Sequence, residues 1–256
     1  MQHNEIVPLE QLQEERYSRI LCYPRHNSRE ATRRIRELKR LGVKTIEFLG
    51  KKTAFNVAVL GKGCVGIVVI AHTKTGRAAI KIRRVDANRK GMEHEAKMLA
   101  KANRIGIGPR FIGISEDFLL MEYIEGVLLP SWTANLKGRG SKKRLRKVLR
   151  DVLEQCWKLD EAGLDHGELS RAPKHIIVDV DDEARIVDFE TASTMRRTAN
   201  VTSICQYLFL GSQLAKTLRR RMGKIDNEAL ISALRDYKSQ RNAKNFIRIL
   251  QACKLE

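Results

Sequence analysis

The amino-acid sequence predicts an α+β protein with a β-rich N-terminal part and a mostly helical C-terminal part. Up to about residue 124 the apolar residues fall in short β-branched runs, whereas beyond Gly126 they recur at the spacing of amphipathic helices. A glycine-rich run over residues 60–68 is followed by β-branched residues that favour a strand over a helix. A chain of 256 residues, 43% of them hydrophobic, can form one domain of two lobes or two small domains.

The first segment, residues 1–50, is expected to be an N-terminal helical extension. Asn27 and Ser28 are good N-cap residues for a helix that Gly42 would end. The elements expected here and just beyond are helices over residues 8–22 and 29–41 and strands over residues 45–49 and 55–60. Two helices followed by a pair of strands are compatible with a winged-helix-like element that reads nucleic acid, and equally with a brace for the β-rich part.

Residues 51–124 are expected to form a small β-rich lobe. Turn residues interrupt its β-branched runs, and Met92, Ala96 and Leu99 recur at helical spacing between them. The elements expected here are strands over residues 67–71 and 78–82, a helix over residues 89–103, and a hairpin with strands over residues 111–114 and 118–123.

Residues 125–256 are expected to form a mostly helical lobe. Segments with apolar residues at a helical period predominate, and one acidic turn over residues 179–182 separates two short apolar runs. The elements expected here are helices over residues 142–163, 202–222, 227–238 and 243–253 and strands over residues 175–178 and 184–187.

Three features of the β-rich part indicate phosphate binding. The run Gly61-x-Gly63-x-x-Gly66-x-Val68 places glycines where a backbone can approach a phosphate closely and donate its N–H groups. Lys81 lies on the strand that follows. Glu95 lies on the next helix, from which its carboxylate can hold the Lys81 ammonium in place. These residues predict a hairpin that covers phosphates and a lysine that neutralises them.

Two further motifs lie in the helical part. His166-Gly167-Glu168-Leu169 comes after a long helix and before a hairpin, and Asp188-Phe189-Glu190 comes directly after an apolar strand. A buried strand that ends in an acid places a carboxylate at its end, where it can bind Mg²⁺. Asp188 is therefore the first candidate for a metal ligand.

In this order the five motifs resemble the glycine loop, Ala-x-x-Lys, helix Glu, His-x-Asp and Asp-Phe-Gly of protein-kinase-like phosphotransferases. The segment after Asp188 is short and has no Ala-Pro-Glu, so the chain most resembles the minimal atypical type: archaeal predicted serine/threonine kinases similar to RIO kinases and to the kinase of the KEOPS complex. The resemblance begins at about residue 56. It implies a bilobal protein-kinase-like fold with a small β-rich N-lobe and a reduced, mostly helical C-lobe.

The same resemblance implies how ATP would be bound. Lys81 would contact the α- and β-phosphates, and Glu95 would pair with it. Met121 would stand at the gatekeeper position, and the backbone of Glu122 and Ile124 would face the adenine.

For catalysis, the resemblance implies that Asp188 binds Mg²⁺, or Mn²⁺ in its place. Glu168 would orient or deprotonate the acceptor hydroxyl, with its carboxylate one methylene further out than the family's aspartate. The family's second metal ligand, an asparagine, corresponds to Pro173 by direct counting and to His175 when the following strand is aligned. Imidazole is a softer ligand than an amide oxygen and suits Mg²⁺ less well. Glu190, which replaces the family's glycine, is a further candidate.

The function expected from these residues is that of an atypical serine/threonine protein kinase, which transfers the γ-phosphate of Mg-ATP to a protein hydroxyl or to itself. Three alternatives stay open. They are an ATPase or nucleotide-dependent switch on an RNA–protein particle in ribosome or tRNA maturation, a catalytically weak pseudokinase scaffold, and a kinase for a small molecule.

The charge of the chain indicates polyanionic partners. Lys and Arg number 49 against 30 Asp and Glu, which gives a formal net charge of +19. Residues 137–150 hold eight Lys and Arg and no acid, and Arg219-Arg220-Arg221 adds a second cluster. The stretch over residues 137–150 predicts contacts with the backbone of RNA or a ribonucleoprotein, or alternatively a solvated helix face.

The sequence gives no indication of a membrane or secretory protein. No stretch approaches the roughly 18 apolar residues that span a bilayer, and the N-terminus lacks a signal-peptide pattern. The five cysteines are scattered without a C-x-x-C pair, which is typical of reduced thiols. We therefore expect a soluble, cytoplasmic protein without a membrane partner.

Overall fold

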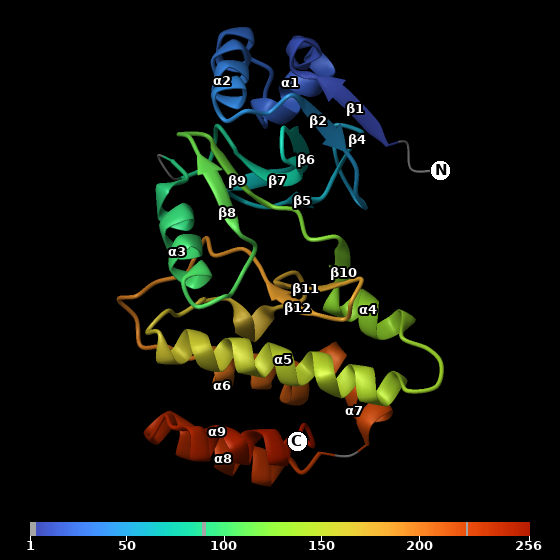
Figure 1. The fold of residues 1–256 in the computed structure, drawn as a ribbon, viewed down its shortest axis with the longest axis vertical. Coiled ribbons are helices and arrows are strands. Elements are labelled where there is room, and N and C mark those ends of the chain that lie inside the picture. The colour runs from blue at the N-terminus through green and yellow to red at the C-terminus, as the bar shows by residue number, and fades with distance from the viewer. Residues whose placement is uncertain (1–3, 89–90, 224) are drawn as a thin grey trace. The chain divides into compact units, whose positions relative to one another are not determined.

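The computed structural model describes residues 4–88, 91–223 and 225–256 and has an α+β architecture with a sheet region and a helical part (Figure 1). The chain divides into two compact units. Unit 1 runs to Ala100 and resumes over Pro109–Tyr123, and unit 2 comprises Lys101–Gly108 and Ile124–Glu256. Among the residues described, no helix combines the length and the apolar character needed to cross a membrane.

Unit 1 is built on a seven-stranded antiparallel sheet in the order β1-β2-β6-β7-β9-β8, with β5 also paired to β6. A separate hairpin is formed by β3 and β4. The elements of this part of the chain are β1 (Glu5–Pro8), the 3-10 turn η1 (Leu9–Gln13), α1 (Glu15–Leu21), α2 (Ser28–Arg40), β2 (Thr45–Phe48), β3 (Lys52–Ala54), β4 (Val57–Val59), β5 (Gly61–Lys62), β6 (Gly66–Thr73), β7 (Gly76–Arg83), α3 (Glu93–Asn103), β8 (Phe111–Ile114) and β9 (Phe118–Glu122).

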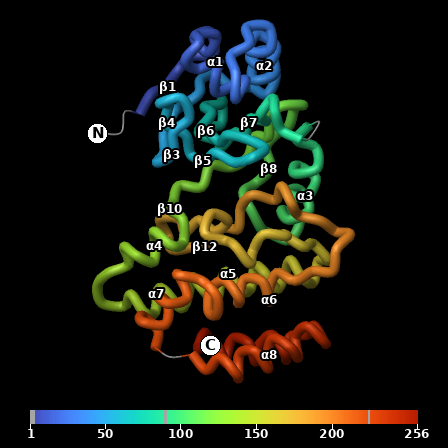
Figure 2. Tube along the Cα trace, turned by 180° about the vertical axis from the view of Figure 1, so that it is seen from behind, coloured from blue at the N-terminus to red at the C-terminus, as the bar shows by residue number. Residues whose placement is uncertain are grey.

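One face of this sheet carries the core of unit 1. Alternate residues of a strand point to the same side, so Ile67 and Val69 of β6 face the same way as Ile80 of β7 and Leu120 of β9. These side chains are buried in one hydrophobic cluster with residues of α1 and α2, which lie next to the sheet in Figures 1 and 2. The first 50 residues therefore contribute strands and helices to the same sheet and core as the strands that follow.

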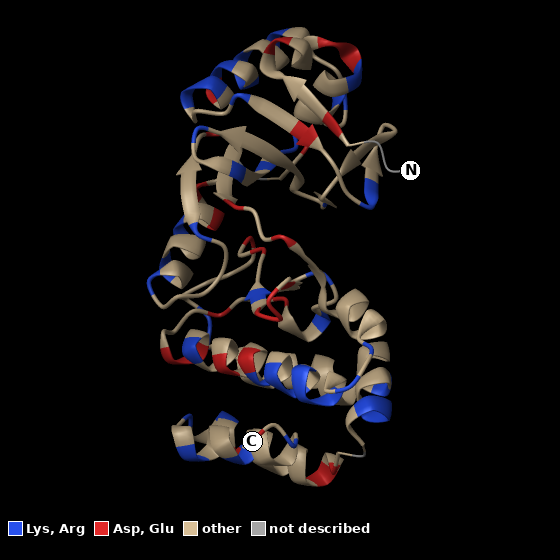
Figure 3. Ribbon diagram, turned by 45° about the vertical axis from the view of Figure 1, so that its right-hand side comes forward, with Lys and Arg blue, Asp and Glu red and all other residues tan. Residues whose placement is uncertain are grey.

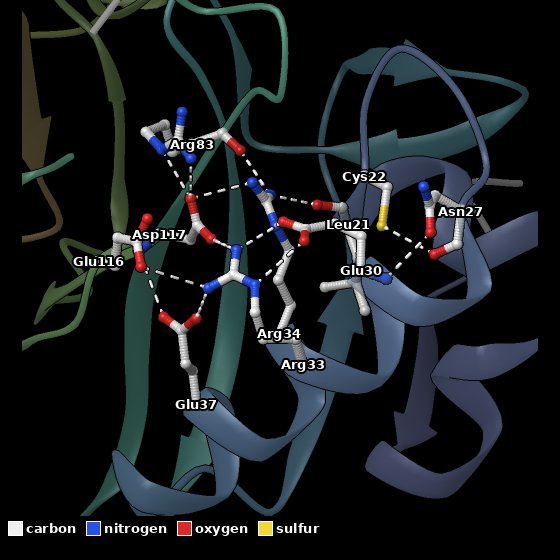
Figure 4. A network of polar contacts seen from close by, with 10 residues as sticks. All are labelled: Leu21, Cys22, Asn27, Glu30, Arg33, Arg34, Glu37, Arg83, Glu116 and Asp117. Carbon is white, nitrogen blue, oxygen red and sulfur yellow. Dashed lines mark hydrogen bonds and ion pairs between the residues drawn. The ribbon is translucent and has the colours of Figure 1, made fainter. Parts of the chain in front are cut away.

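A network of buried charges joins α2 to the sheet (Figure 4). The Asp117 carboxylate, which is fully buried, lies 3.0 Å from Nη2 of Arg34 and 2.5 Å from Nη2 of Arg83, and it also pairs with Arg33. Arg34 is fully buried too, and its Nε lies 2.7 Å from Glu30. Buried charges are costly unless paired and hydrogen-bonded, and here every one of these charges has a partner.

Unit 2 is mostly helical. Figures 1 and 2 both show α5 between a three-stranded antiparallel sheet, in the order β10-β11-β12, and the pair α8–α9. Its elements are β10 (Gly126–Leu128), α4 (Leu129–Asn135), α5 (Ser141–Glu161), the 3-10 turn η2 (Leu169–Arg171), β11 (Ile176–Asp179), β12 (Ala184–Ile186), α6 (Asn200–Cys205), the π-helical turn η3 (Gln206–Leu210), α7 (Gln213–Met222), α8 (Asn227–Ser239) and α9 (Ala243–Ala252).

The single helix predicted over residues 202–222 is wrong. Instead α6 passes into the π-helical turn η3, which ends at Leu210 before Gly211, and α7 starts anew after Ser212. The Ser212 hydroxyl accepts the backbone N–H of Ala215 at 2.9 Å, so an N-cap lies in the middle of the predicted helix. The apolar period continues across this break, which is why the pattern alone conceals it.

Other boundaries differ as well. Of the strand predicted over residues 55–60, Val57–Val59 forms β4, whereas Phe55 and Asn56, with φ angles of 50° and 62°, form the turn of the β3–β4 hairpin. The helix predicted over residues 8–22 is divided into η1 and α1, with the extended residue Glu14 between them. The helix predicted from residue 89 is observed from Glu93, and residues 89–90 lie outside the described residues. The short elements β10 and α4 were not predicted.

Candidate functional site

The sheet face opposite the core of unit 1 carries three of the predicted nucleotide-binding side chains. Val68 of β6 is paired directly with Lys81 of β7, and Met121 of β9 is paired with Ala79, two residues before Lys81. Directly paired residues, and residues two apart on a strand, share a face. Val68, Lys81 and Met121 therefore lie on one face, while the residues between them along each strand point into the core.

The predicted lysine–carboxylate pair is formed. Nζ of Lys81 lies 2.9 Å from Oε1 and 2.8 Å from Oε2 of Glu95, and the two residues are only 5% and 4% exposed. A lysine on a flexible four-carbon stem samples many positions when it is exposed. Burial and a carboxylate that accepts through both oxygens hold this ammonium at one position.

Of the three glycines of the β5–β6 hairpin, only one is required by the packing of the protein itself. A Cβ on Gly66 would lie 2.9 Å from the Ile82 carbonyl oxygen and 3.0 Å from Cγ of Lys81, so the packing of β7 excludes a side chain. Gly61 and Gly63 have no positive φ, and a Cβ on either would meet nothing closer than 3.5 Å among the described residues. Neither strain nor packing explains glycine at these two positions, and a close-approaching ligand would.

The two predicted hinge residues fall on either side of the division between the units. Glu122 ends β9 in unit 1, where its backbone N–H donates to the Arg110 carbonyl at 2.8 Å and its carboxylate accepts the Arg110 N–H at 2.9 Å. Ile124 begins the second part of unit 2.

In unit 2, Glu168, His175 and Asp188 form one cluster. Nε2 of His175 lies 2.8 Å from Oε2 of Glu168, and its Nδ1 lies 3.7 Å from Oδ2 of Asp188. One ligand atom from each residue lies within 4.8 Å of the others, a spacing at which the three residues could hold a metal ion. The imidazole is buried, whereas the Glu168 and Asp188 side chains are 38% and 29% exposed. The two carboxylates therefore face solvent while the histidine lies beneath them.

The β11–β12 hairpin brings His175 and Asp188 together. The N–H of Val187 donates to the His175 carbonyl at 2.9 Å, which extends the strand pairing to the residue before Asp188. This pairing places His175, rather than the exposed Pro173, beside the acid. Asp188 itself has a φ of 70°, a left-handed conformation that costs a non-glycine residue about 1–3 kcal/mol and is concentrated at functional sites.

His166 packs against this cluster on its buried side. It is fully buried, and its Nε2 lies 3.1 Å from the Val187 carbonyl. Its ring lies 5.3 Å from that of His175 and 5.2 Å from that of Phe189, between centroids. Burial, together with the neighbouring His175, lowers the pKa of His166 to about 4. The neutral imidazole therefore donates its Nε2–H to Val187 and packs against the ring of His175.

Two buried residues that the sequence analysis does not single out hold the His166 loop. Oδ1 of Asn200 accepts the His166 N–H at 2.8 Å, and its Nδ2 donates to Asp160 and to the Leu164 carbonyl, both at 2.8 Å. Asp160 also accepts the hydroxyl of Tyr237 at 3.1 Å, and burial raises the pKa of that phenol. The signal in the sequence was weak: an acid on the apolar face of a long helix and an asparagine at the start of another.

Gly167 is also fixed by its surroundings. Its φ is 89°, and a Cβ would lie 2.5 Å from Nη2 of Arg196 and 3.0 Å from Oγ1 of Thr191. Arg196 donates through Nε to Asp165 at 3.0 Å, and the Thr191 hydroxyl donates to the His166 carbonyl at 3.0 Å. The loop before Glu168 is thus held at several points, so the direction of the Glu168 backbone is well defined.

The two basic clusters of the sequence differ in their contacts. Arg219 donates to the Phe209 carbonyl in η3 at 3.0 Å, and Arg221 donates to the Leu136 carbonyl after α4 at 2.9 Å, so two of the three consecutive arginines satisfy backbone carbonyls. In contrast, the cations within residues 137–150 are exposed except Arg146, which is half-buried. Two arginines of the cluster at residues 219–221 therefore stabilise the fold, whereas the cations of residues 137–150 lie mainly at the surface.

Comparison with known proteins relates the chain to an archaeal protein. No family model matches the chain. A comparison with curated proteins finds the uncharacterized protein MJ1211 of Methanocaldococcus jannaschii, which is 33% identical over 102 residues. The matched region is 40% of this chain and 83% of that protein. The chain therefore belongs to the same family as the uncharacterized protein MJ1211.

Proposed function

We propose that the protein is an ATP-dependent phosphotransferase of the atypical serine/threonine kinase type, and that its two units are the lobes of a minimal bilobal protein-kinase-like fold. The observation that carries the proposal is the buried Lys81–Glu95 pair on the sheet face opposite the core. A buried ion pair is weak evidence for stability, because its desolvation offsets most of its attraction. A fixed ammonium beside a glycine hairpin is better explained by binding of phosphate oxygens.

The neighbouring residues support the nucleotide assignment. Val68 and Met121, which are half-buried on the same face as Lys81, offer apolar surface to a base. Gly61 and Gly63 lie on the β5–β6 hairpin, where no packing requires them. A phosphate that accepts backbone N–H groups explains small residues at both positions.

The residues of unit 2 fit a divalent cation. Two carboxylates and an imidazole within 4.8 Å of one another supply a ligand set for Mg²⁺ or Mn²⁺, with the imidazole favouring Mn²⁺. Asp188 and His175 would hold the ion, together with Glu168 or with water. When bound, such an ion neutralises the charge of phosphate oxygens.

Glu168 is the residue we assign to the acceptor hydroxyl. Its carboxylate is partly exposed, on a loop held by Asn200 and Arg196 through their contacts with neighbouring residues. A carboxylate at this place accepts a hydrogen bond from a serine or threonine hydroxyl and takes its proton as the phosphoester bond forms. His175, 2.8 Å from Glu168, orients that carboxylate.

The test is transfer of phosphate from γ-labelled ATP to the protein itself and to a generic protein acceptor, with Mg²⁺ or Mn²⁺. We expect Lys81→Met and Asp188→Ala each to reduce transfer by at least about 100-fold, because each removes a charge that acts on phosphate or metal. The matched controls are Lys74→Met, an exposed lysine in the β6–β7 turn, and Asp181→Ala, an exposed acid in the β11–β12 turn. Full activity of Lys81→Met or of Asp188→Ala would refute the proposal.

A second candidate function is favoured by the exposed cations of residues 137–150. In an ATPase or switch that works on an RNA–protein particle, ATP would be hydrolysed without stable phosphoprotein, and RNA would stimulate hydrolysis. Release of labelled inorganic phosphate without labelled protein separates this function from protein phosphorylation. A pseudokinase scaffold, in turn, would give neither product.

A further inference from the structure

The first turn of α5 has a charge arrangement that opposes helix stability. Lys142, Lys143 and Arg144 lie in it, with neither an acid nor a side-chain cap. Positive charges near a helix N-terminus oppose the helix dipole, and acids are favoured there. Among the described helices, α1, α2, α3 and α8 have an acid in the first turn, and α4, α6, α7 and α9 have none. What distinguishes α5 is that three consecutive cations follow its first residue, with neither an acid nor a side-chain cap.

The cations of α5 also repel one another. Lys142, Arg146 and Arg150 are spaced four residues apart, and so are Lys143 and Lys147 in the next row. Like charges at this spacing are neighbours on a helix surface and destabilise it. The opposite side of the helix is buried, so these five cations lie on the side of α5 that does not pack into the core. We call this set, Lys142, Lys143, Arg146, Lys147 and Arg150, the α5 basic face.

The α5 basic face is open and lines a groove. Four of its cations are exposed and Arg146 is half-buried, and all five line a groove of about 610 Å³ whose lining includes one acid, Glu256. Figure 3 shows basic residues along the first half of α5 and acidic residues toward its C-terminal end. Arg144 does not line this groove and pairs with Asp182 in the β11–β12 turn, with Nη2 2.7 Å from Oδ1. Arg150 lines the groove and also pairs with Glu154 one turn further along α5, with Nε 2.8 Å from Oε1.

We propose that the α5 basic face binds the phosphodiester backbone of a nucleic acid. The row from Lys142 to Arg150 is roughly 12 Å long, at 1.5 Å per residue, which is the length of duplex axis along which one strand places three or four phosphates, at about 3.4 Å of axial rise each. Bound phosphates would remove both the repulsion and the conflict with the helix dipole. Residues 137–150 include no aromatic residue, so contacts are with the backbone rather than with stacked bases.

A membrane surface fits this face less well. Peripheral membrane helices place large apolar residues beside their cations. The exposed large hydrophobic side chains among the described residues, Val127 and Val180 for instance, lie outside residues 137–150. This proposal concerns only α5 and stands or falls independently of phosphate transfer.

The test compares two variants of the full chain with the same net charge. The face variant carries Gln at Lys142, Lys143, Lys147 and Arg150. The control variant carries Gln at four exposed cations elsewhere in unit 2: Lys216, Arg220, Arg235 and Lys244. Binding is measured by fluorescence anisotropy with labelled single-stranded RNA, RNA duplex and DNA duplex over a range of salt concentrations, and with phosphatidylserine vesicles.

We expect the face variant to lose at least about 100-fold in nucleic-acid affinity at low salt, and the slope of log K against log salt to fall by roughly 3 for a single strand. The control variant should stay within about threefold of the wild-type protein. The three nucleic acids identify which backbone is preferred. Equal losses in the two variants, or binding to vesicles alone, would overturn the proposal.

A second readout does not depend on any ligand. Because the four cations repel one another and two of them, Lys142 and Lys143, oppose the helix dipole, we expect the Tm of the face variant to rise by roughly 2 °C in low salt. A lower Tm would show that these residues stabilise the free protein and would remove the main argument for a polyanionic partner.

Discussion

At the scale of single residues, the packing of Gly66 against β7 determines where the Lys81 side chain lies in unit 1. Gly66 lies beside β7 so closely that a Cβ would be 3.0 Å from Cγ of Lys81. The missing side chain leaves room for the lysine stem to reach Glu95. Gly66 thus sets the position of the ammonium from within the protein, whereas neither backbone strain nor packing requires glycine at positions 61 and 63.

This difference gives a prediction for two glycine variants. Gly66→Ala should destabilise the protein by about 1–3 kcal/mol in urea unfolding and lower the rate of phosphate transfer, because the methyl group displaces Lys81. Gly63→Ala should leave the free energy of unfolding nearly unchanged, since the nearest atom to its Cβ is 3.7 Å away, and should raise the KM for ATP. Equal destabilisation by the two variants would contradict this account of Gly66.

The buried His166 predicts a pH dependence of stability. Its pKa is about 4 in the folded protein and near 6.5 in the unfolded chain, so between these values the unfolded state binds more protons. The stabilisation by neutral His166 is present above pH 6.5 and lost as the pH falls to 4, by up to about 3 kcal/mol. Urea unfolding across this range measures it.

His166→Gln keeps a donor for the Val187 carbonyl but cannot be protonated. Its stability should depend less on pH between 6.5 and 4 than that of the wild-type protein. His94→Gln, in which an exposed histidine is replaced, serves as the control and should retain the wild-type pH dependence. The same pH dependence in all three proteins would show that His166 does not carry the effect.

At the scale of elements, the network around Asp117 fixes α2 on the sheet of unit 1. Asp117 precedes β9, Arg83 ends β7, and Arg33 and Arg34 belong to α2, so one carboxylate joins three elements. Arg34 also donates to the Leu21 carbonyl at 2.5 Å, which adds the end of α1. The N-terminal helices are thereby tied to the strands that carry Lys81 and Met121.

Removal of this carboxylate should be severe. Asp117→Ala leaves the buried arginines without their shared acceptor, so we expect a loss of about 3–5 kcal/mol in the free energy of unfolding. The adjacent Glu116→Ala removes a carboxylate that is 60% exposed and 3.5 Å from Arg33, and should change stability by less than about 0.5 kcal/mol. Chemical denaturation of both variants checks the difference. Similar losses in the two would mean that the network contributes little.

At the scale of the whole molecule, local patterns predict the α+β composition and most of the elements. Period and turn residues are sufficient for β6, β7, α2 and α5, whose faces are strongly apolar on one side. They fail where a local hydrogen bond interrupts a continuing pattern, as at Ser212, and where an unusual backbone makes a turn, as at Phe55 and Asn56. Such features depend on single residues, which a periodic pattern averages out.

The candidate site is predictable to a similar extent. The Lys81–Glu95 pair follows from the order of strand and helix, and the structure brings its members together. The sequence does not determine whether His175 or Pro173 lies beside Asp188, because that depends on the register of the β11–β12 hairpin. In the structure it is His175. The support from Asp160 and Asn200 depends on contacts between residues 40 positions apart, and no local pattern reveals it.

The central claim is that the fixed Lys81 ammonium acts on the phosphates of ATP. The most direct measurement is the rate of phosphate transfer from γ-labelled ATP by the full chain, compared between the wild-type protein and the Lys81→Met and Lys74→Met variants under the same Mg²⁺ and Mn²⁺ concentrations. We predict transfer by the wild-type protein and by Lys74→Met, and a loss of at least about 100-fold in Lys81→Met. Transfer at the wild-type rate by a folded Lys81→Met variant would contradict the claim.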